Sequence, residues 1–230
     1  MSKTSVNIPT CKQDNCLIRK TSITYNRVIQ QLTLLDFIPL LLARIYLAPI
    51  FIIAGLNKWQ NFASTAEWYG NADWGLGLPM PAVLVGLTVL AEFVGGFALL
   101  FGVMTRVFSL MLAITMVVAA WTVHLKNGWF AIAPSDASTS TARFFDWFGL
   151  SSAQVSITAS EQVNERLTMA RHILQEHGNY EWLTEMGNFI ILQNGIEFAS
   201  TYFLILLFLL MYGGGRFLSV DYWIKYRQKR

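Results

Sequence analysis

Residues 34–56 read LLDFIPLLLARIYLAPIFIIAGL, a run in which apolar side chains greatly outnumber polar ones. A helix needs about 20 mostly apolar residues to cross the hydrocarbon core of a bilayer. This run therefore predicts a membrane-spanning helix. It begins too late and is too long for a cleaved signal peptide, so we expect it to be retained. Three further apolar runs follow, at about residues 82–102, 107–125 and 189–212.

The composition of the whole chain agrees with these runs. Hydrophobic residues make up 54% of the sequence and charged residues only 13%, whereas soluble domains carry about 25% charged residues. Such a chain is too hydrophobic for a disordered protein, and its two cysteines exclude a disulfide scaffold. We predict an all-α polytopic membrane protein, a bundle of four transmembrane helices with the second and third joined as a hairpin.

Charge predicts the orientation of this bundle. Between residues 127 and 188 there are three basic and seven acidic residues, whereas basic residues dominate both tails, 1–33 and 213–230. Cytoplasmic loops carry the excess of Lys and Arg. We therefore expect a multi-pass protein of the cytoplasmic (inner) membrane, with both tails cytoplasmic and an outer loop at 127–188 that separates the last two spans of a membrane domain at 34–212. The tails fit topology signals and anionic lipid, and not nucleic acid.

Both outer loops have features of their own. Ser160 resembles a helix N-cap, Val163 and Leu167 follow at helical spacing, and Gly178 is placed to end the helix, which predicts an amphipathic helix over residues 161–177. The first outer loop, residues 58–80, is rich in aromatic residues. Such residues favour the membrane interface, and a re-entrant loop that lines a small pocket is the alternative.

Three ionisable residues lie well inside the predicted spans: Arg44, Glu92 and Glu197. Each costs about 2.5–3.5 kcal/mol to insert, and such residues usually face the bundle interior. Arg44 and Glu92 lie at matching depths, counted from the cytoplasmic ends of their helices. We therefore expect an ion pair between them, either a structural pair that fixes helix register or part of a proton, quinone or substrate site.

A second polar layer is predicted near the outer ends of the spans. It consists of Asn57, Lys58, His124, Gln193 and Asn194, together with Glu197. Polar residues in membrane proteins usually turn inward and line a cavity. We therefore expect an outward-facing pocket here, roofed by the aromatic loop 59–74 and by the helix 161–177.

No metal site is predicted from the histidines and cysteines. His124 stands alone at a helix end, and a metal site needs several converging ligands. Cys11 and Cys16 lie in the cytoplasmic tail, where thiols stay reduced. Their spacing fits a metal or redox pair poorly without further ligands, so we expect a solvated tail there.

Three segments together resemble the DoxX family of small four-helix membrane proteins. They are RIYLAPIFIIAGLNKW (44–59), LAEFVGGFALLFGVMTR (90–106) and TVHLKNGWF (122–130). Arg44, Glu92 and His124 fall at the polar positions of these motifs. The resemblance covers roughly residues 40–130, and it implies a membrane-embedded helical bundle.

Other segments resemble one branch of that family, the HvfX-type proteins. They are HGNYEWLTEMGNFIILQNGIEFASTYF (177–203), GGGRFLSVDYW (213–223) and EWYGNADWGLGLP (67–79). Members of this branch accompany systems that make copper-binding, post-translationally modified peptides. Other DoxX relatives are described as quinone-linked thiosulfate oxidoreductase subunits or as redox-stress partners.

The sequence and these resemblances leave three candidate functions. The first is an accessory protein in maturation, export or handling of a copper-binding modified peptide, with that peptide or its maturation proteins as partners. The second is a quinone-linked oxidoreductase subunit of the thiosulfate:quinone type, and the third is a structural membrane partner of a redox complex. The sequence contains no motif for a bound cofactor or a soluble-enzyme active site. It leaves open whether the chain is an enzyme and whether it forms a homo-oligomer.

Overall fold

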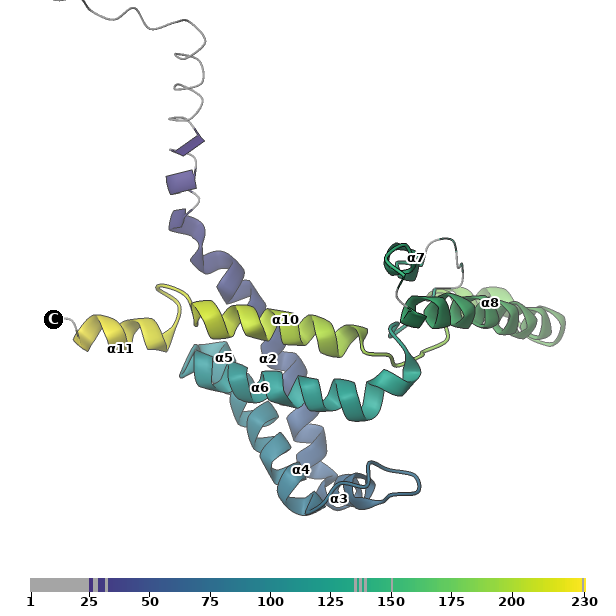
Figure 1. Ribbon diagram of the computed structural model, residues 1–230, viewed down its shortest axis with the longest axis horizontal. Helices are drawn as coiled ribbons and strands as arrows, with labels where there is room; N and C mark the ends of the chain where they lie inside the picture. The colour runs from purple at the N-terminus through teal and green to yellow at the C-terminus, as the bar shows by residue number, and fades with distance from the viewer. Residues whose placement is uncertain are drawn as a thin grey trace, which may run out of the picture.

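The computed structural model of the protein describes residues 25–26, 29–31, 33–134, 136, 138, 140–149, 151–228 and 230. The cysteines of the N-terminal tail lie outside this part of the chain. All elements of the described part are helical except one isolated bridge, between Ile132 and Leu192. The prediction of an all-α polytopic membrane protein is confirmed (Figure 1).

The helices follow one another along the chain and include two π-helical turns, η2 and η3, and two 3-10 turns, η1 and η4. Their bounds are η1 (Thr33–Leu35), α2 (Phe37–Gln60), α3 (Phe62–Gly70), α4 (Pro81–Val89), η2 (Leu90–Val94), α5 (Gly95–Phe101), α6 (Thr105–Ala119), η3 (Ala120–His124), η4 (Leu125–Asn127), α7 (Ala142–Asp146), α8 (Ser151–His177), α9 (Tyr180–Thr184), α10 (Glu197–Tyr212) and α11 (Val220–Gln228).

Within the described residues, three helical stretches are long and apolar enough to cross a membrane. One contains α2, and the others are Pro81–Phe101 and Thr105–Asn127. They correspond to the first three predicted spans. The fourth predicted span, 189–212, is helical only from Glu197 onward, and α10 has 16 residues. At 1.5 Å per residue it is about 24 Å long, which is less than the ~30 Å hydrocarbon core.

Backbone pairing explains the late start of α10. The amides of Gly195, Ile196 and Glu197 donate to the carbonyls of residues 128–130, so these amides pair with the preceding loop and not with the helix. Asn194 has a φ of 58°, which breaks helical geometry. A Cβ on Gly195 would lie 2.5 Å from the carbonyl oxygen of Phe130. The close approach of the two segments therefore requires glycine at this position.

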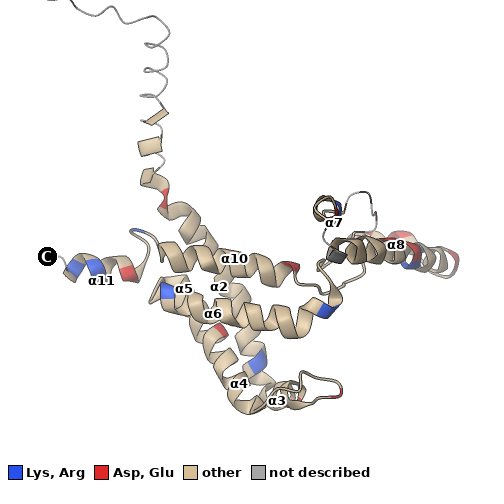
Figure 2. Ribbon diagram, viewed as in Figure 1, with Lys and Arg blue, Asp and Glu red and all other residues tan. Residues whose placement is uncertain are grey.

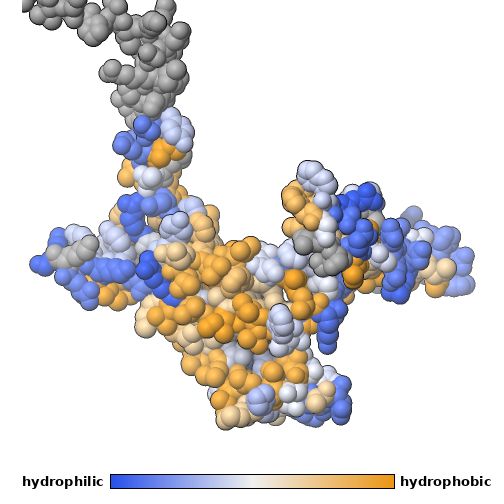
Figure 3. All heavy atoms as spheres, viewed as in Figure 1, coloured by the Kyte–Doolittle hydropathy of each residue, from blue (hydrophilic) through white to orange (hydrophobic). Residues whose placement is uncertain are grey.

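The spans pack through an apolar core and through glycines. Leu47, Phe51, Leu99, Leu112 and Leu206 are among its fully buried members. α10 lies beside α6, and α2 packs against α5 and η2 (Figure 1). The face of the bundle that Figure 3 shows is largely apolar as well. An apolar exterior around an apolar core is the pattern of a helix bundle that faces lipid.

Glycines set how closely α2 approaches its neighbour. A Cβ on Gly55 would lie 2.5 Å from the amide nitrogen of Phe93, and one on Gly96 would lie 2.9 Å from that of Ile52. Small residues at such crossings let helix backbones approach closely in membranes. α2 and the η2–α5 segment are therefore in near-backbone contact.

The loop between η4 and α10 contains α8, a helix of 27 residues that extends away from the bundle (Figure 1). It begins at Ser151 and not at Ser160, so the predicted N-cap is wrong. No Gly or Pro interrupts residues 151–159, and Ser160 is buried and donates its hydroxyl to the carbonyl of Ser156. The predicted end is confirmed, because α8 stops at His177 and the amide of Gly178 donates to the carbonyl of Leu174.

Candidate functional site

An ion pair lies between the C-terminal end of α2 and the turn η2. Lys58 Nζ donates to Glu92 Oε2 at 2.6 Å, and the Glu92 side chain is only 4% exposed. The Lys58 side chain is 27% exposed, so its aliphatic stem packs inward while part of the residue reaches the surface. Charged residues are otherwise sparse along the spans and concentrate at their ends and on α8 (Figure 2). A carboxylate at this depth is therefore an exception that needs its lysine partner.

π-helical turns carry two of the polar residues of this region. Glu92 lies on η2, and His124 is the last residue of η3. A π-turn fits one extra residue into a helix, and such turns occur frequently at functional sites. In this bundle each turn interrupts a span at the point where an ionisable side chain is presented.

A cavity of about 480 Å³ opens beside the ion pair, between α3–α4–η2 and α6–η3. Its wall is mainly apolar, with a few polar groups: Lys58, Trp68, Tyr69, Leu76, Leu78, Leu84, Leu87, Thr88, Ala91, Glu92, Met111, Ile114, Thr115, Val118, Ala119, Thr122, Val123 and His124. We call it the ion-pair pocket. Its volume lies within the ~300–1,000 Å³ of small-molecule sites, which combine apolar walls with a few polar groups.

The expected pair between Arg44 and Glu92 is wrong. The Arg44 guanidinium is buried and donates to four backbone carbonyls, those of Leu99 (2.6 Å), Leu100 (2.8 Å), Gly214 (2.7 Å) and Leu218 (3.0 Å). These bonds join α2 to the end of α5 and to the turn after α10. Arg44 thus serves as a structural cross-link at the end of the bundle opposite the ion-pair pocket.

The register of α2 explains this outcome. Arg44 lies level with Leu99 and Leu100, the last turn of α5. Glu92 precedes Leu99 by seven positions, about 10 Å along the helix. It instead lies near the level of Gly55, which contacts the neighbouring Phe93. From there, the long Lys58 side chain reaches it from the next turn of α2.

The predicted outer polar layer divides into two groups. Lys58 and His124 line the ion-pair pocket with Glu92. Asn194 and Glu197 belong to the second group, which joins the start of α10 to the segment after the third span: His124 Nδ1 lies 2.9 Å from the carbonyl oxygen of Asn194, and Ala131 N donates to Glu197 Oε2 at 3.0 Å. Gln193 pairs through its backbone amide with the carbonyl of Ala131.

Asn57 takes no part in either group. It is exposed, and its side-chain oxygen accepts a hydrogen bond from Asn61 Nδ2 at 2.8 Å. The aromatic loop does contribute to the predicted pocket, because Trp68 and Tyr69 line it. The helix α8 is not among its lining elements.

Sequence reasoning missed a row of threonines in the pocket wall. Thr115 and Thr122 lie seven positions apart on the α6–η3 stretch, and Thr88 lies on α4 opposite them. Residues seven apart share one helix face, so the first two form a polar stripe. Their spacing could have been recognised in the sequence. All three hydroxyls donate to the carbonyl four residues earlier, which leaves their oxygen lone pairs available as acceptors.

Metal ligands do not cluster in the described part of the chain. No group of three or more His, Cys, Asp and Glu side chains there could hold a metal ion. The pocket contributes one carboxylate and one imidazole, which are accompanied by lysine and aromatic residues.

Fold and site together define a polytopic helical membrane protein with a buried ion pair beside an apolar pocket. Residues 39–125 match the DoxX family. The matched residues include Arg44, Lys58, Glu92 and His124. α7–α11 lie beyond the matched residues.

Two named relatives are similar over the same part of the chain. The first, named "Putative oxidoreductase CatD" and from Bacillus subtilis (strain 168), is 30% identical over 86 residues, which are 37% of this chain and 60% of the relative. The second, named "Inner membrane protein YqjF" and from Escherichia coli (strain K12), is 34% identical over 90 residues, 39% of this chain and 65% of the relative. The chain thus spans less than two thirds of either relative. No solved structure matches the chain.

Proposed function

We propose that this protein is an inner-membrane accessory protein that binds a small amphipathic group in the ion-pair pocket. One observation carries this proposal: the Lys58–Glu92 pair, with a carboxylate 4% exposed, borders an apolar cavity of about 480 Å³. A buried charged pair is a costly way to fix two helices, and ionisable residues at membrane depth mark ligand and proton sites. The pair would orient a ligand by hydrogen bonds, while Trp68 and Tyr69 would contact its flat face.

The process that we propose for the protein is maturation, export or handling of a copper-binding modified peptide. The support is the resemblance of residues 67–79, 177–203 and 213–223 to the HvfX-type branch. Residues 67–79 include Trp68, Tyr69, Leu76 and Leu78 of the pocket wall. A modified segment of the peptide would occupy the pocket, and α7–α9 would meet the peptide or its maturation proteins. Since the pocket offers one imidazole and one carboxylate, it would hold the organic part of such a peptide, and copper would stay with the peptide's own ligands.

The alternative is a quinone-linked oxidoreductase subunit. The printed name of the Bacillus relative favours this class. A quinone headgroup is planar and carries carbonyl oxygens that accept hydrogen bonds, which matches an aromatic wall with a lysine donor. In this case Glu92 would exchange protons with the reduced headgroup.

The test compares Glu92→Gln and Lys58→Met with the parent in the native host. Glu67→Gln on α3 is the matched control, because Glu67 is exposed and does not line the pocket. With protein levels held equal, the peptide function predicts that both pocket variants lose copper tolerance and mature peptide. The oxidoreductase function predicts instead that membranes lose thiosulfate-dependent quinone reduction. If both pocket variants match Glu67→Gln in both assays, the pocket has no role in either function.

We also propose that α10 is the fourth span and that both termini are cytoplasmic. The basic tails and the acidic 127–188 segment support this orientation. In a background without Cys11 and Cys16, Glu165→Cys on α8 should react with an impermeant thiol reagent added to intact cells. Gln228→Cys on α11 should react only after the membrane is opened. Labelling of Gln228→Cys in intact cells would contradict the topology, and it would leave the pocket chemistry unaffected.

A further inference from the structure

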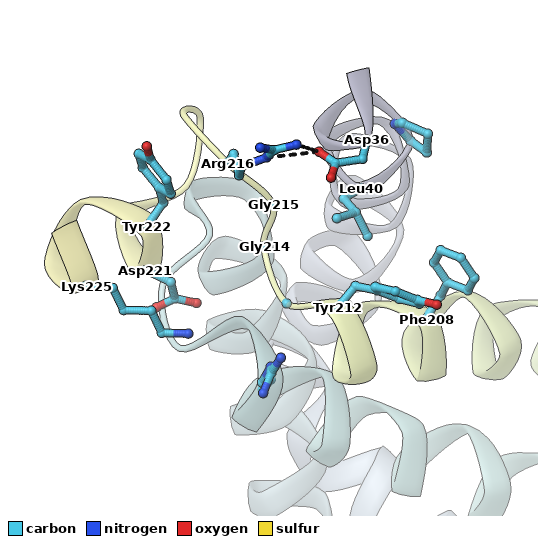
Figure 4. Close-up of a pocket in the computed structure, with 13 residues that line it drawn as sticks. Asp36, Leu40, Phe208, Tyr212, Gly214, Gly215, Arg216, Asp221, Tyr222 and Lys225 are labelled. Atoms are coloured by element: carbon cyan, nitrogen blue, oxygen red, sulfur yellow. Dashed lines mark hydrogen bonds and ion pairs between the residues drawn. The ribbon is translucent and has the colours of Figure 1, made fainter. Parts of the chain in front are cut away.

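A second cavity, of about 590 Å³, lies at the end of the bundle where α2 and α6 begin and α10 ends (Figure 4). We call it the boundary pocket. It is lined by Asp36, Pro39, Leu40, Arg106, Phe208, Tyr212, Gly213, Gly214, Gly215, Arg216, Asp221, Tyr222 and Lys225. Gly213 and Gly215 have φ values of 78° and 84°, which only glycine adopts readily. These residues turn the chain from α10 toward α11 and form one wall of the cavity.

Basic side chains outnumber acidic ones in the lining of the boundary pocket. Asp36 already pairs with Arg216 at 2.8 Å, and Figure 4 shows this pair at the rim. The Asp221 carboxylate accepts the backbone amides of residues 104 and 105 at 2.7 and 2.8 Å. Both acidic groups therefore have donors from the protein itself. Arg106 and Lys225 supply the remaining positive charge.

Arg106 is oriented by the protein while most of its donors stay available. Its Nη2 donates to the carbonyl of Met211 at 2.9 Å, and a guanidinium carries five N–H donors in a fixed fork. That fork matches phosphate geometry. Lys225 of α11 also lines the pocket (Figure 4), and it can add a second cation to the same anion.

The opposite half of the boundary pocket is apolar and belongs to the spans. Leu40 comes from α2, and Phe208 and Tyr212 come from the last turns of α10. Phe208 is 55% exposed on a membrane helix, so this side of the cavity is continuous with the surface that faces lipid chains. A ligand that fits both halves has an anionic head and an apolar tail.

We propose that the boundary pocket binds the phosphate-bearing headgroup of an anionic phospholipid. The phosphate would lie against Arg106 and Lys225, and the glycerol and first acyl carbons would lie along Phe208 and Leu40. Basic pockets between transmembrane helices are a recurring form of lipid headgroup site. The proposal concerns the opposite end of the bundle from the ion-pair pocket, and it holds whichever function that pocket has.

The experiment measures binding of fluorescent phosphatidylglycerol to the purified full chain in neutral detergent, with phosphatidylcholine as the uncharged comparison. Lys225→Gln removes a cation that has no hydrogen bond to another described residue, and Arg106→Gln removes the second cation. Each should weaken phosphatidylglycerol binding about fivefold, since a basic residue near an anionic lipid surface contributes about 1 kcal/mol. Thermal unfolding of each variant checks that the fold is retained.

Arg227→Gln is the matched control, because Arg227 is an exposed base on the same helix that does not line the pocket. Unchanged binding by this variant, with loss in the two pocket variants, supports the proposal. Equal loss in all three variants would show general attraction to the basic residues at this end of the bundle and would overturn the proposal. Displacement of the lipid by millimolar inorganic phosphate would assign the site to free phosphate instead, and no preference for phosphatidylglycerol would also refute the lipid site.

Discussion

Replacing Arg44 with methionine should loosen the end of the bundle at which α2, α5 and α10 meet. The guanidinium is 1% exposed and joins four carbonyls, two on the last turn of α5 and two in the segment between α10 and α11. Methionine has a similar length and can fill most of the volume. It has no donor, so all four carbonyls lose this partner.

The size of the effect follows from those four bonds. A hydrogen bond between membrane helices contributes about 0.6 kcal/mol on average, and a buried acceptor left unsatisfied costs about 1 kcal/mol or more. We therefore expect the free energy of unfolding to fall by about 2–4 kcal/mol. The free energy of unfolding of Arg44→Lys should lie between those of the parent and Arg44→Met. One ammonium keeps the charge but cannot reach carbonyls on separate segments.

The measurement is detergent-induced unfolding in mixed micelles, followed by tryptophan fluorescence. Arg216→Gln is the control, since Arg216 forms an exposed pair with Asp36 at side-chain exposures of 43% and 54%. Exposed pairs contribute no more than about 1 kcal/mol. If Arg44→Met unfolds within about 0.5 kcal/mol of the parent, the four carbonyls do not depend on Arg44 and the reasoning fails.

Two further predictions concern the outer half of the bundle. Lys58→Met should destabilise the protein by about 3 kcal/mol, because it leaves the Glu92 carboxylate buried without its cation. The double variant with Glu92→Gln should recover at least half of that loss in the same unfolding assay, and an additive loss would argue against coupling. Gly55→Ala should cost about 1–3 kcal/mol, because its Cβ would lie 2.5 Å from the facing backbone. Gly86→Ala, with nothing within 4 Å, should instead stabilise α4 by about 0.5–1 kcal/mol, and equal effects at the two glycines would refute the close crossing.

The membrane spans could be predicted from the sequence because length and apolar character suffice to define them. The start of α10 could not. Residues 189–196 are apolar enough to read as a continuation of the helix, but the backbone of Gly195 pairs with residues from the preceding outer loop. Only the tertiary fold brings those two segments together. The start of α8 could not be predicted either. Ser160 is a residue type that favours the N-cap position, but it lies inside a longer helix.

The charged residues of the site could be predicted from the sequence, and their pairing could not. The cost of charge in a membrane singles out Arg44 and Glu92 without any structural knowledge. The depths of Arg44 and Glu92 were counted from the predicted ends of their helices. Because α2 is shifted along its axis relative to α5, equal counts do not place the two side chains at the same level. Lys58 was assigned to the outer layer by its position in sequence. Its long side chain spans a helical turn and reaches Glu92. Counting residues along a helix places the backbone only and does not account for this reach.

The bonds of Arg44 also constrain how the protein is made. The first span leaves the ribosome long before its partner Gly214, which lies 170 positions later. At about 5–20 residues per second, the delay is roughly 10–30 s. During that interval the arginine must be sheltered by water, lipid headgroups or the insertion machinery. α10 and the turn that follows it then complete the assembly, so a chain truncated before Gly214 should stall as an insertion intermediate and become a substrate for membrane proteases.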